Sequence, residues 1–390
     1  MSREWGSPPW RVDVALRADV PPARVDVAVV GGGLTGLGAA YALAHRGVGV
    51  AVLEAVVIGA GASGRTGAIV LEHTAVGPLD GMNDCLTHLT RIVEREGIAC
   101  DLDLRGCWET SHRPASVRAS ASGSAAAPTG DRVDGGNALR WRDGDAELVV
   151  SEVVPGGTLD AGALLAGLAH AALDRGATIH EHSEVATISP GTPVRLGVRR
   201  NGREHVVEAT HVVLALNAYT ATVLPLAVEI VPSLTLALAT APLDDATIDA
   251  IGLGPRLPFY TADLPYLWGR LLADGRVVFG SGLAFDPDRR VERLAITRGE
   301  AATALARLEE RVRGFHPLLA SAAVDRRWGG PIAFRAGWAP LLARHPQSPT
   351  VIVTGAYAGH GVAQSVKAGA LAAAAIAGER DLPHWGTFAR

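Results

Sequence analysis

The hydrophobic pattern near the start of the chain changes from that of a strand to that of a helix and back. Residues 25–30 form a short apolar run rich in β-branched side chains, which is typical of a buried parallel strand. Apolar residues then recur at helical spacing over 37–44, and a second apolar run covers 48–53. The pattern therefore predicts a strand, a helix and a second strand within residues 25–53.

Similar alternation returns later and predicts two further pieces of the same sheet. Leucines at helical spacing over 164–173 are followed by an apolar run that begins at 177, and residues 211–219 form another buried run. Near the C-terminus, a strand pattern at 350–354 precedes a glycine turn and a long helical pattern at 355–378. We therefore expect a sheet assembled from three separate pieces of chain.

Other parts of the chain have the pattern of antiparallel strands joined by turns. Alternating runs, a two-residue hairpin signal and charged helical stretches are the features that indicate them. The expected elements are strands at 228–240, 266–272 and 276–280, a hairpin at 195–207 that turns at Asn201-Gly202, and helices at 79–97 and 291–314. Residues 115–136 are of low complexity and are expected to form a mobile excursion.

Together the patterns predict an α/β protein with a Rossmann-like dinucleotide-binding domain, discontinuous in sequence, and an antiparallel-sheet (α+β) domain that binds the substrate. The length of 390 residues agrees with two domains. The expected division is an N-terminal arm at 1–24, a dinucleotide-binding domain at 25–78, 150–222 and 335–390, and a substrate-binding domain at 79–149 and 223–334.

Three glycines after the first strand have the spacing of a dinucleotide-binding turn. Gly31 permits the tight turn, Gly33 leaves room for a pyrophosphate, and Gly36 lets the helix pack close to the strand. Glu54 ends the second strand about 20 residues later, where a carboxylate binds the ribose 2′-hydroxyl group. A βαβ packing turn without a ligand remains the alternative, because the same spacing recurs in a loop at 59–64.

Composition changes this picture mainly by exclusion. The formal net charge of −4 gives no reason to expect a nucleic-acid partner. The three cysteines are odd in number and lack metal-ligand spacing, so we expect reduced thiols, no metal and a cytoplasmic protein. The first residues lack the apolar core of a signal peptide, and the alanine-rich run at 368–377 is too short to span a bilayer. No membrane association is therefore expected.

With these pieces in order, the chain resembles the FAD-dependent D-amino-acid-oxidase superfamily. Its members include glycine oxidase, sarcosine oxidase and the γ-glutamylputrescine-oxidase-like branch. The resemblance covers nearly the whole chain. The motifs that carry it are Gly31–Gly36 with Glu54, GASGRTG at 61–67, LALNAY at 214–219, DGRVVFG at 274–280, RWGG at 327–330 and the terminal GAYAGHGVAQSVKAG.

The resemblance implies FAD as cofactor and assigns part of it to each motif. The matching residues are Gly31, Gly33, Leu34, Thr35 and Gly36 at the pyrophosphate, Glu54 at the ribose, Val185 at the adenine, Ser63, Gly64, Arg65, Thr66 and Gly67 along the flavin, and Gly359, His360, Gly361 and Val362 at its pyrimidine end. The positive end of a helix that begins near Val362 would also stabilise negative charge on a reduced flavin. Relatives with covalent flavin attach it through a histidine or a cysteine. Here Arg65 stands where those relatives have the histidine, and no cysteine follows Cys107, so noncovalent FAD is expected.

The resemblance also implies a reaction. An amine or amino acid, primary or secondary and including N-substituted glycines, would lose a hydride to N5 of FAD; the imine would be hydrolysed, and oxygen would be reduced to hydrogen peroxide. No acid or base is obligatory for this chemistry. The substrate-side candidates are Tyr266, Trp268 and Arg270, which share one face if they lie in a strand, together with Arg335 and Tyr357. A solvent-facing strand, and a surface ion pair at Arg335, are the alternatives. The oligomeric state stays open.

Three other functions remain open. A dehydrogenase would pass electrons to a carrier, an FAD monooxygenase would be reduced by NAD(P)H, and a flavin-binding redox subunit would have no turnover of its own. Sarcosine-oxidase relatives place a lysine over the flavin to help oxygen react, whereas the single lysine here, Lys367, falls inside the C-terminal helix. Reduction of the flavin by an amine, and not by NAD(P)H, distinguishes amine oxidation from the monooxygenase and the redox subunit, whereas a dehydrogenase differs from an oxidase only in its reactivity with oxygen.

Overall fold

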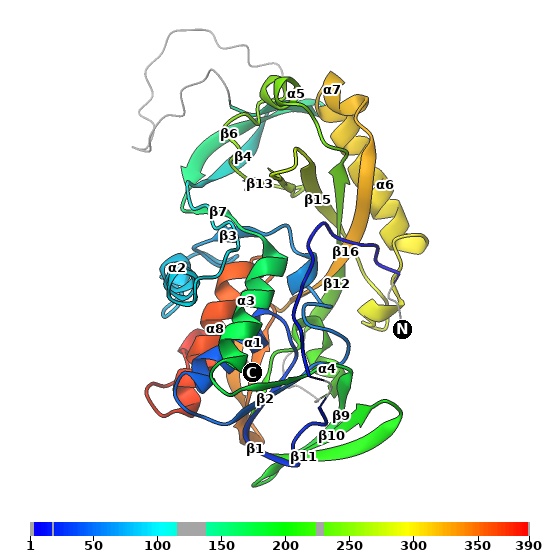
Figure 1. Ribbon diagram of the computed structural model, residues 1–390. Coiled ribbons are helices and arrows are strands. Elements are labelled where there is room, and N and C mark those ends of the chain that lie inside the picture. Colours follow the sequence, from blue (N-terminus) through cyan, green and yellow to red (C-terminus); the bar gives the residue numbers. More distant parts are fainter. Residues whose placement is uncertain (1–3, 18, 115–137, 224–229, 389–390) are drawn as a thin grey trace.

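The computed structural model describes residues 4–17, 19–114, 138–223 and 230–388, and two large sheets organise them (Figure 1). The first sheet has the strand order β17-β18-β11-β1-β2-β8, and β10 and β9 extend it from β11. The strands from β18 to β8 are parallel, whereas β17 is antiparallel to β18. Its strands are β1 (Arg24–Val30), β2 (Val50–Leu53), β8 (Thr178–His180), β9 (Ser183–Ser189), β10 (Val194–Arg200), β11 (Arg203–Leu214), β17 (Leu341–His345) and β18 (Ser348–Gly355).

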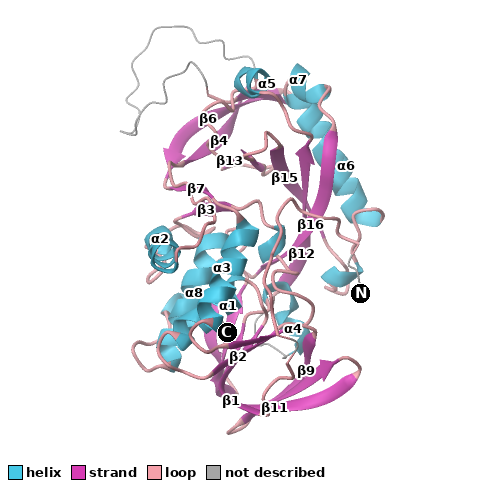
Figure 2. Cartoon of the chain, viewed as in Figure 1, coloured by secondary structure: helices cyan, strands magenta, loops and turns pink. Residues whose placement is uncertain are grey.

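Helices gather against the parallel strands of the first sheet (Figure 2). They are α1 (Leu34–Ala44), α3 (Ala161–Leu173) and α8 (Gly361–Ile376), while α2 (Cys85–Glu96) packs on α8, α3 and β3 (Ile69–Leu71). Helix α1 packs against both α3 and α8, and its approach to α8 is close. A Cβ atom at Gly369 would lie 2.4 Å from the carbonyl oxygen of Thr35, so the two helix backbones meet where a side chain is missing. This contact holds the start of α1 against the middle of α8.

The second sheet has the strand order β16-β12-β15-β14-β13-β4-β6-β5. It is antiparallel except for the parallel pair β4 and β13, and α6 (Gly299–Phe315) packs on β12 and β15. Its strands are β4 (Cys107–Pro114), β5 (Arg140–Asp143), β6 (Ala146–Val154), β12 (Val231–Thr240), β13 (Phe259–Thr261), β14 (Trp268–Leu271), β15 (Val277–Ala284) and β16 (Val324–Phe334). Aromatic rings fill the core under α6, where Trp141 stacks on Phe315 with ring centroids 5.1 Å apart.

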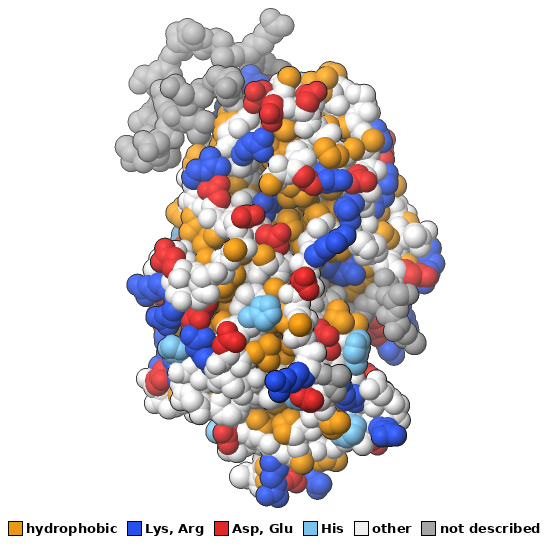
Figure 3. Space-filling model, viewed as in Figure 1, with side chains coloured by type: hydrophobic (Ala, Val, Ile, Leu, Met, Phe, Trp, Pro, Cys, Tyr) orange, Lys and Arg blue, Asp and Glu red, His pale blue; other side chains and the backbone are white. Residues whose placement is uncertain are grey.

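Smaller elements complete the described chain. The strands β3 (Ile69–Leu71) and β7 (Gly156–Thr158) form a two-stranded sheet between the two large ones (Figure 1). Three short helices, α4 (Thr220–Val223), α5 (Asp245–Ala250) and α7 (Pro317–Ala320), lie in connections. On the face shown in Figure 3, acidic and basic side chains are interspersed.

The expected hairpin is confirmed: β10 and β11 pair up to Arg200 and Arg203, and Asn201 and Gly202 have φ of 49° and 74°. Other boundaries were wrong. The run expected as a separate strand at 211–219 is the end of β11, which stops at Leu214. Helix α2 begins at Cys85 and α6 at Gly299, later than the patterns indicated. Strands β4 to β6 were not predicted. Residues 115–136 lie outside the described chain, and the exact domain boundaries remain a prediction.

Candidate cofactor and substrate site

The glycine turn joins β1 to α1 at the carboxyl end of the parallel sheet. A Cβ atom at Gly36 would lie 1.9 Å from the carbonyl oxygen of Gly31, so only glycine lets the helix start this close to the strand. A Cβ atom at Gly33 would lie 2.8 Å from Oγ of Ser63, which brings a second predicted motif to the same place. The Ser63 hydroxyl group also accepts a hydrogen bond from the backbone N–H of Leu34 at 3.0 Å.

Glu54 meets the same turn from the end of β2. Its Oε2 accepts a hydrogen bond from the N–H of Gly32 and its Oε1 accepts one from the N–H of Val56, each at 2.8 Å. The carbonyl oxygen of Glu54 accepts a hydrogen bond from the N–H of Ser183, the first residue of β9. Val185 lies two residues further along the same strand. The predicted pyrophosphate and ribose residues are therefore neighbours in space, and the strand carrying the predicted adenine contact begins beside them.

The side chain of Tyr357, four residues before α8, reaches the first turn of α1 at Thr35. The first turn of each helix lacks acidic residues, and neither Gly33 nor His360 caps its helix with a side-chain hydrogen bond. Helix N-termini of this kind carry partial positive charge that favours an anion. His360 is buried, which lowers the pKa of its imidazole below the usual range and favours the neutral form.

Tyr357, a substrate-side candidate, is buried in the interior. Its hydroxyl group hydrogen-bonds with the hydroxyl groups of Thr35, at 3.0 Å, and Thr354, at 2.9 Å. Burial raises the pKa of Tyr357 to about 12. The side chain thus ties α1 to the end of β18, and its contact with a substrate stays a prediction. Asn217 of the LALNAY motif supports the same corner by accepting a hydrogen bond from the N–H of Ala356 at 2.9 Å.

We call residues 63–68 the cofactor loop. Its backbone carbonyl groups accept hydrogen bonds from three side chains that are distant in sequence. These are Trp328 Nε1 to Arg65 O at 3.0 Å, Trp10 Nε1 to Thr66 O at 2.7 Å, and Arg270 Nη1 to Ala68 O at 2.9 Å. The loop is therefore fastened to the second sheet and to the N-terminal segment.

The guanidinium group of Arg65, a residue predicted to line the flavin, contacts the N-terminal segment and β16. Nη1 donates to the carbonyl oxygens of Gly6 at 2.9 Å, Trp5 at 3.3 Å and Gly329 at 3.3 Å. The guanidinium carbon also lies 5.6 Å from the centre of the Trp5 ring. The side chain of Arg65 thus binds the N-terminal segment, and its backbone is the part that belongs to the loop.

Trp268 and Tyr266 have different surroundings. The Trp268 ring lies against two glycines, because Cβ atoms at Gly67 and Gly280 would approach it within 2.4 Å and 1.9 Å. Trp268 thus forms a wall that touches the cofactor loop. The Tyr266 hydroxyl group lies 2.9 Å from the hydroxyl group of Thr235 and donates to the Gly282 carbonyl oxygen at 2.7 Å. Burial raises the pKa of Tyr266 to about 12. Tyr266 precedes β14, so it does not share the strand with Trp268 as expected.

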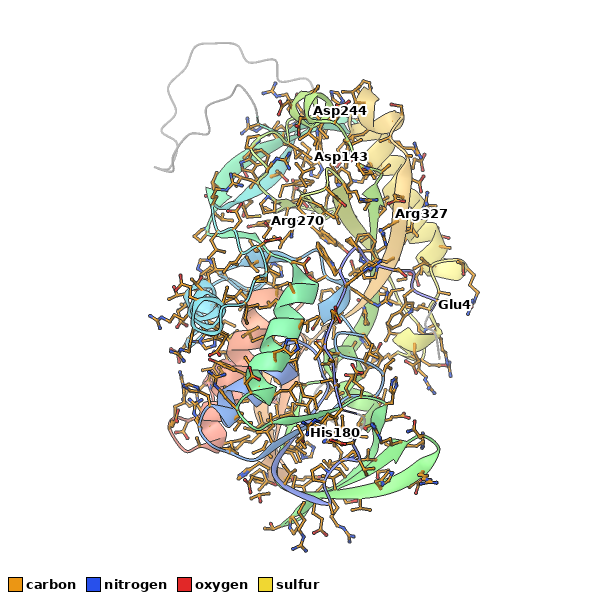
Figure 4. All side chains as sticks on the ribbon, viewed as in Figure 1. Glu4, Asp143, His180, Asp244, Arg270 and Arg327 are labelled. Atoms are coloured by element: carbon orange, nitrogen blue, oxygen red, sulfur yellow. The ribbon has the colours of Figure 1, made fainter. Side chains whose placement is uncertain are left out.

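Arg270 lies between the second sheet and the helices below it, as Figure 4 shows. It is 8% exposed, and Nη1 donates to the carbonyl oxygens of Ala68 at 2.9 Å and Leu159 at 2.7 Å. Its Nε is buried and has no hydrogen-bond partner among the described residues. Among the same residues, the guanidinium group also has no ion-pair partner. Burial lowers the pKa of Arg270 to about 10, and more distant acidic residues oppose that shift only in part.

Arg335 is buried to the same extent, at 8% exposed, but contacts another part of the chain. Its Nη1 donates to the carbonyl oxygen of Thr387 at 2.9 Å, in the C-terminal segment. Burial lowers the pKa of Arg335 as well. The alternative of a surface ion pair does not describe it, because the side chain is buried and bonds a backbone carbonyl group.

The remaining candidates for other chemistry are structural in the described chain. Cys85, Cys100 and Cys107 are free and buried, and burial raises the pKa of the Cys85 thiol to about 12. Lys367 pairs with Asp84 at 2.7 Å. No helix of the described residues has both the length and the apolar character needed to cross a membrane.

A family model described as FAD dependent oxidoreductase (DAO) matches residues 26–375, most of the chain. The chain belongs to this family. The expected resemblance and the FAD dependence that it implied are thereby confirmed. The chain is also similar to a curated protein, the probable oxidoreductase OrdL of Haemophilus influenzae, with 29% identity over 227 residues, which cover 55% of this chain and 46% of that protein. The match thus spans about half the length of that relative.

Solved structures show that the DAO-family fold extends over nearly the whole chain. Glycine oxidase from Geobacillus kaustophilus has a TM-score of 0.70 at 17% identity and covers 95% of this chain and 99% of its own. L-Proline dehydrogenase from P. horikoshii has a TM-score of 0.67 at 16% identity, with 93% and 96% covered. At these identities the likeness establishes the fold alone, and the expected α/β class with a Rossmann-like FAD-binding domain is confirmed.

The residues present fit the FAD that the DAO family uses. The glycine turn lets the start of α1 pack close to β1, Glu54 stands at the end of β2, and the first turns of α1 and α8 carry no acidic residue. Which residues hold FAD remains the prediction made from the sequence. That prediction gave no role to Trp10 and quoted Trp328 only within a motif. Tryptophans in a proline-dotted N-terminal segment were the available signal.

Proposed function

We propose that this FAD-dependent oxidoreductase oxidises the C–N bond of an amine that carries a carboxylate group, either an amino acid or an N-substituted glycine. The bound FAD supplies the hydride acceptor for the carbon next to nitrogen. The nitrogen lone pair forms the C=N bond as the hydride leaves, and water hydrolyses the imine to a carbonyl compound and a free amine. Oxygen takes the two electrons and becomes hydrogen peroxide.

The observation that carries this proposal is the buried guanidinium group of Arg270. A buried cation without a counter-ion is costly, and a carboxylate offers both the opposite charge and an acceptor for a buried N–H. Nε of Arg270 has no partner among the described residues, while Nη1 is already bound to the cofactor loop at Ala68. A carboxylate on Arg270 would therefore be held next to the loop that is predicted to line the flavin.

Apolar side chains surround this anchor on the second sheet. Ala237, Ala239, Leu272, Val278 and Trp328 form a buried cluster against which Trp10 and Trp268 pack. An apolar wall excludes water from the amine and disfavours its protonated form, and only the neutral amine has the lone pair that the reaction needs. The chain thus contributes binding, orientation and exclusion of water, and no acid–base residue is required of it.

An anaerobic reduction assay tests the proposal. Holoenzyme is mixed with glycine, sarcosine, longer N-carboxymethyl amines, D-amino acids and γ-glutamylputrescine, and bleaching of the visible flavin absorbance is followed. Sarcosine and N-methylethylamine form a matched pair, because they differ in the carboxylate alone.

The outcomes separate the alternatives. Bleaching by the carboxylated member of such a pair supports the proposal. Bleaching only by amines without a carboxylate contradicts the role of Arg270 as a carboxylate anchor but still supports amine oxidation. Reduction by NAD(P)H alone makes the protein a monooxygenase, and no reduction by any amine favours a redox subunit. Comparing reoxidation by oxygen with reoxidation by an artificial dye separates oxidase from dehydrogenase.

A further inference from the structure

Residues 4–14, which we call the arm, cross from the second sheet to the helices of the first (Figure 1). Gly6 forms an antiparallel bridge with Trp328 of β16, and Trp5 donates its indole N–H to the carbonyl oxygen of Leu294 at 2.8 Å. Further along, Arg11 touches the start of α3, since a Cβ atom at Gly162 would lie 1.9 Å from the Arg11 carbonyl oxygen. The arm therefore spans both sheets and passes over the cofactor loop on the way.

Trp10 stands where the arm meets the site. Its indole N–H donates to the carbonyl oxygen of Thr66 at 2.7 Å. The face of its ring lies 5.5 Å from the guanidinium carbon of Arg270. The ring also packs against two separate buried apolar clusters, one in each half of the molecule. A single side chain thus contacts the cofactor loop, the proposed anion anchor and both cores.

We infer that Trp10 is a positioning residue that acts on two partners at once: it fixes the cofactor loop through Thr66 and holds the Arg270 guanidinium group through its ring. Through Trp10, the arm then affects both the dissociation constant of FAD and the affinity for a carboxylate. The part of the inference that concerns Thr66 assumes only that the protein binds FAD, whereas the part that concerns Arg270 rests on the proposed function.

The two contacts have separate physical origins and can be separated by mutation. A hydrogen bond to a backbone carbonyl group fixes the loop, and its loss leaves Thr66 O without that donor. A cation over an indole face is attracted by the ring quadrupole, which restrains the plane of the guanidinium group. Trp10→Phe removes the N–H donor and keeps an aromatic face, whereas Trp10→Ala removes both.

Trp5→Phe is the matched control. Trp5 also donates an indole N–H to a backbone carbonyl group at a similar distance within the same arm, but its acceptor is Leu294 and not the cofactor loop. Trp5 is fully buried, so this variant carries at least as large a structural cost as Trp10→Phe. Thermal unfolding of the four proteins shows how much of any effect is general loss of stability.

Two equilibrium measurements on the holoenzymes test the inference without using activity. FAD release on dilution, followed by the fluorescence of free flavin, gives the dissociation constant of FAD. Titration with acetate, followed by the visible flavin spectrum, gives the affinity for a carboxylate. We expect Trp10→Phe to raise the FAD dissociation constant about five-fold and to change that of acetate by less than about two-fold. Trp10→Ala raises both about five-fold or more, and Trp5→Phe changes neither beyond about two-fold.

Other outcomes overturn the inference. If Trp5→Phe weakens FAD binding as much as Trp10→Phe does, the arm acts as a general support and Trp10 has no special role. If Trp10→Ala lowers the unfolding temperature and leaves both dissociation constants unchanged, Trp10 is a packing residue. If acetate leaves the wild-type flavin spectrum unchanged, the part of the inference that concerns Arg270 is wrong. Failure of every amine to bleach the flavin overturns the proposed function alone, because neither dissociation constant depends on turnover.

Discussion

Arg270 and Arg335 are two arginines of equal exposure, 8% each, in different surroundings. Arg270 lies under an indole ring, bonds two backbone carbonyl groups beside the cofactor loop and keeps a buried Nε without a partner among the described residues. Arg335 donates to the carbonyl oxygen of Thr387 in the C-terminal segment. Burial by itself therefore does not mark an anion anchor. In our proposal, a buried donor without a partner and a direct contact with the cofactor loop mark the anchor, and Arg270 has both features among the described residues.

The largest expected effect separates the two arginines directly. Arg270→Gln should raise the KM of a carboxylated amine about 100-fold, because a charge-assisted hydrogen bond to the carboxylate is lost. Arg335→Gln should raise it less than about three-fold. Steady-state kinetics with the best substrate of the amine panel provide the measurement, and an amine without a carboxylate is the control substrate. A larger effect of Arg335→Gln would make Arg335 the anchor and reverse the comparison.

The pH dependence of acetate binding sharpens the same comparison. Burial lowers the pKa of Arg270 to about 10, so the guanidinium group is charged below that pH and loses its proton as the pH rises through it. Acetate affinity should stay constant up to about pH 9 and fall about ten-fold per pH unit above about pH 10. Arg335→Gln should keep this profile, whereas an affinity that stays level past pH 11 in a folded protein contradicts the assignment to Arg270.

The parts of the site that lie close together in the chain were predictable from the sequence. The glycine turn, Glu54 and the glycine turn before α8 are local patterns, and the structure places Glu54 beside the turn as the spacing implied. Ser63, which the resemblance and not the spacing indicated, also contacts the α1 N-terminus. Local spacing determines these features because a strand, a tight turn and a helix fix their geometry within a few residues. The Asn201-Gly202 turn was predictable for the same reason, since both residues tolerate positive φ.

The contacts that shape the proposed substrate side could not be predicted, because they join distant residues. Trp10 bonds Thr66 across 56 positions, and Arg270 bonds Ala68 across 202. The hydroxyl group of Tyr357 likewise pairs with Thr35, 322 positions away, while a substrate contact of Tyr357 stays a prediction. Such pairings follow from how distant elements pack, and no local periodicity carries that information.

The smallest expected effect concerns what Arg335 does in place of anchoring a substrate. Its hydrogen bond to Thr387 ties the end of β16 to the C-terminal segment, so Arg335→Gln should lower the free energy of unfolding by about 1 kcal/mol and leave KM near the wild-type value. Arg344→Gln is the matched control, because Arg344 also donates to backbone carbonyl groups, of Pro349 and Ala375, from an exposed position. Chemical denaturation of both variants measures the difference. A stability loss in Arg335→Gln, without one in Arg344→Gln, means that burial of Arg335 serves the structure. The equally buried Arg270 then differs in keeping donors available for a ligand. Equal losses of stability in Arg335→Gln and Arg344→Gln would mean that Arg335 has no special structural role. Only their positions relative to the cofactor loop would then distinguish Arg270 from Arg335.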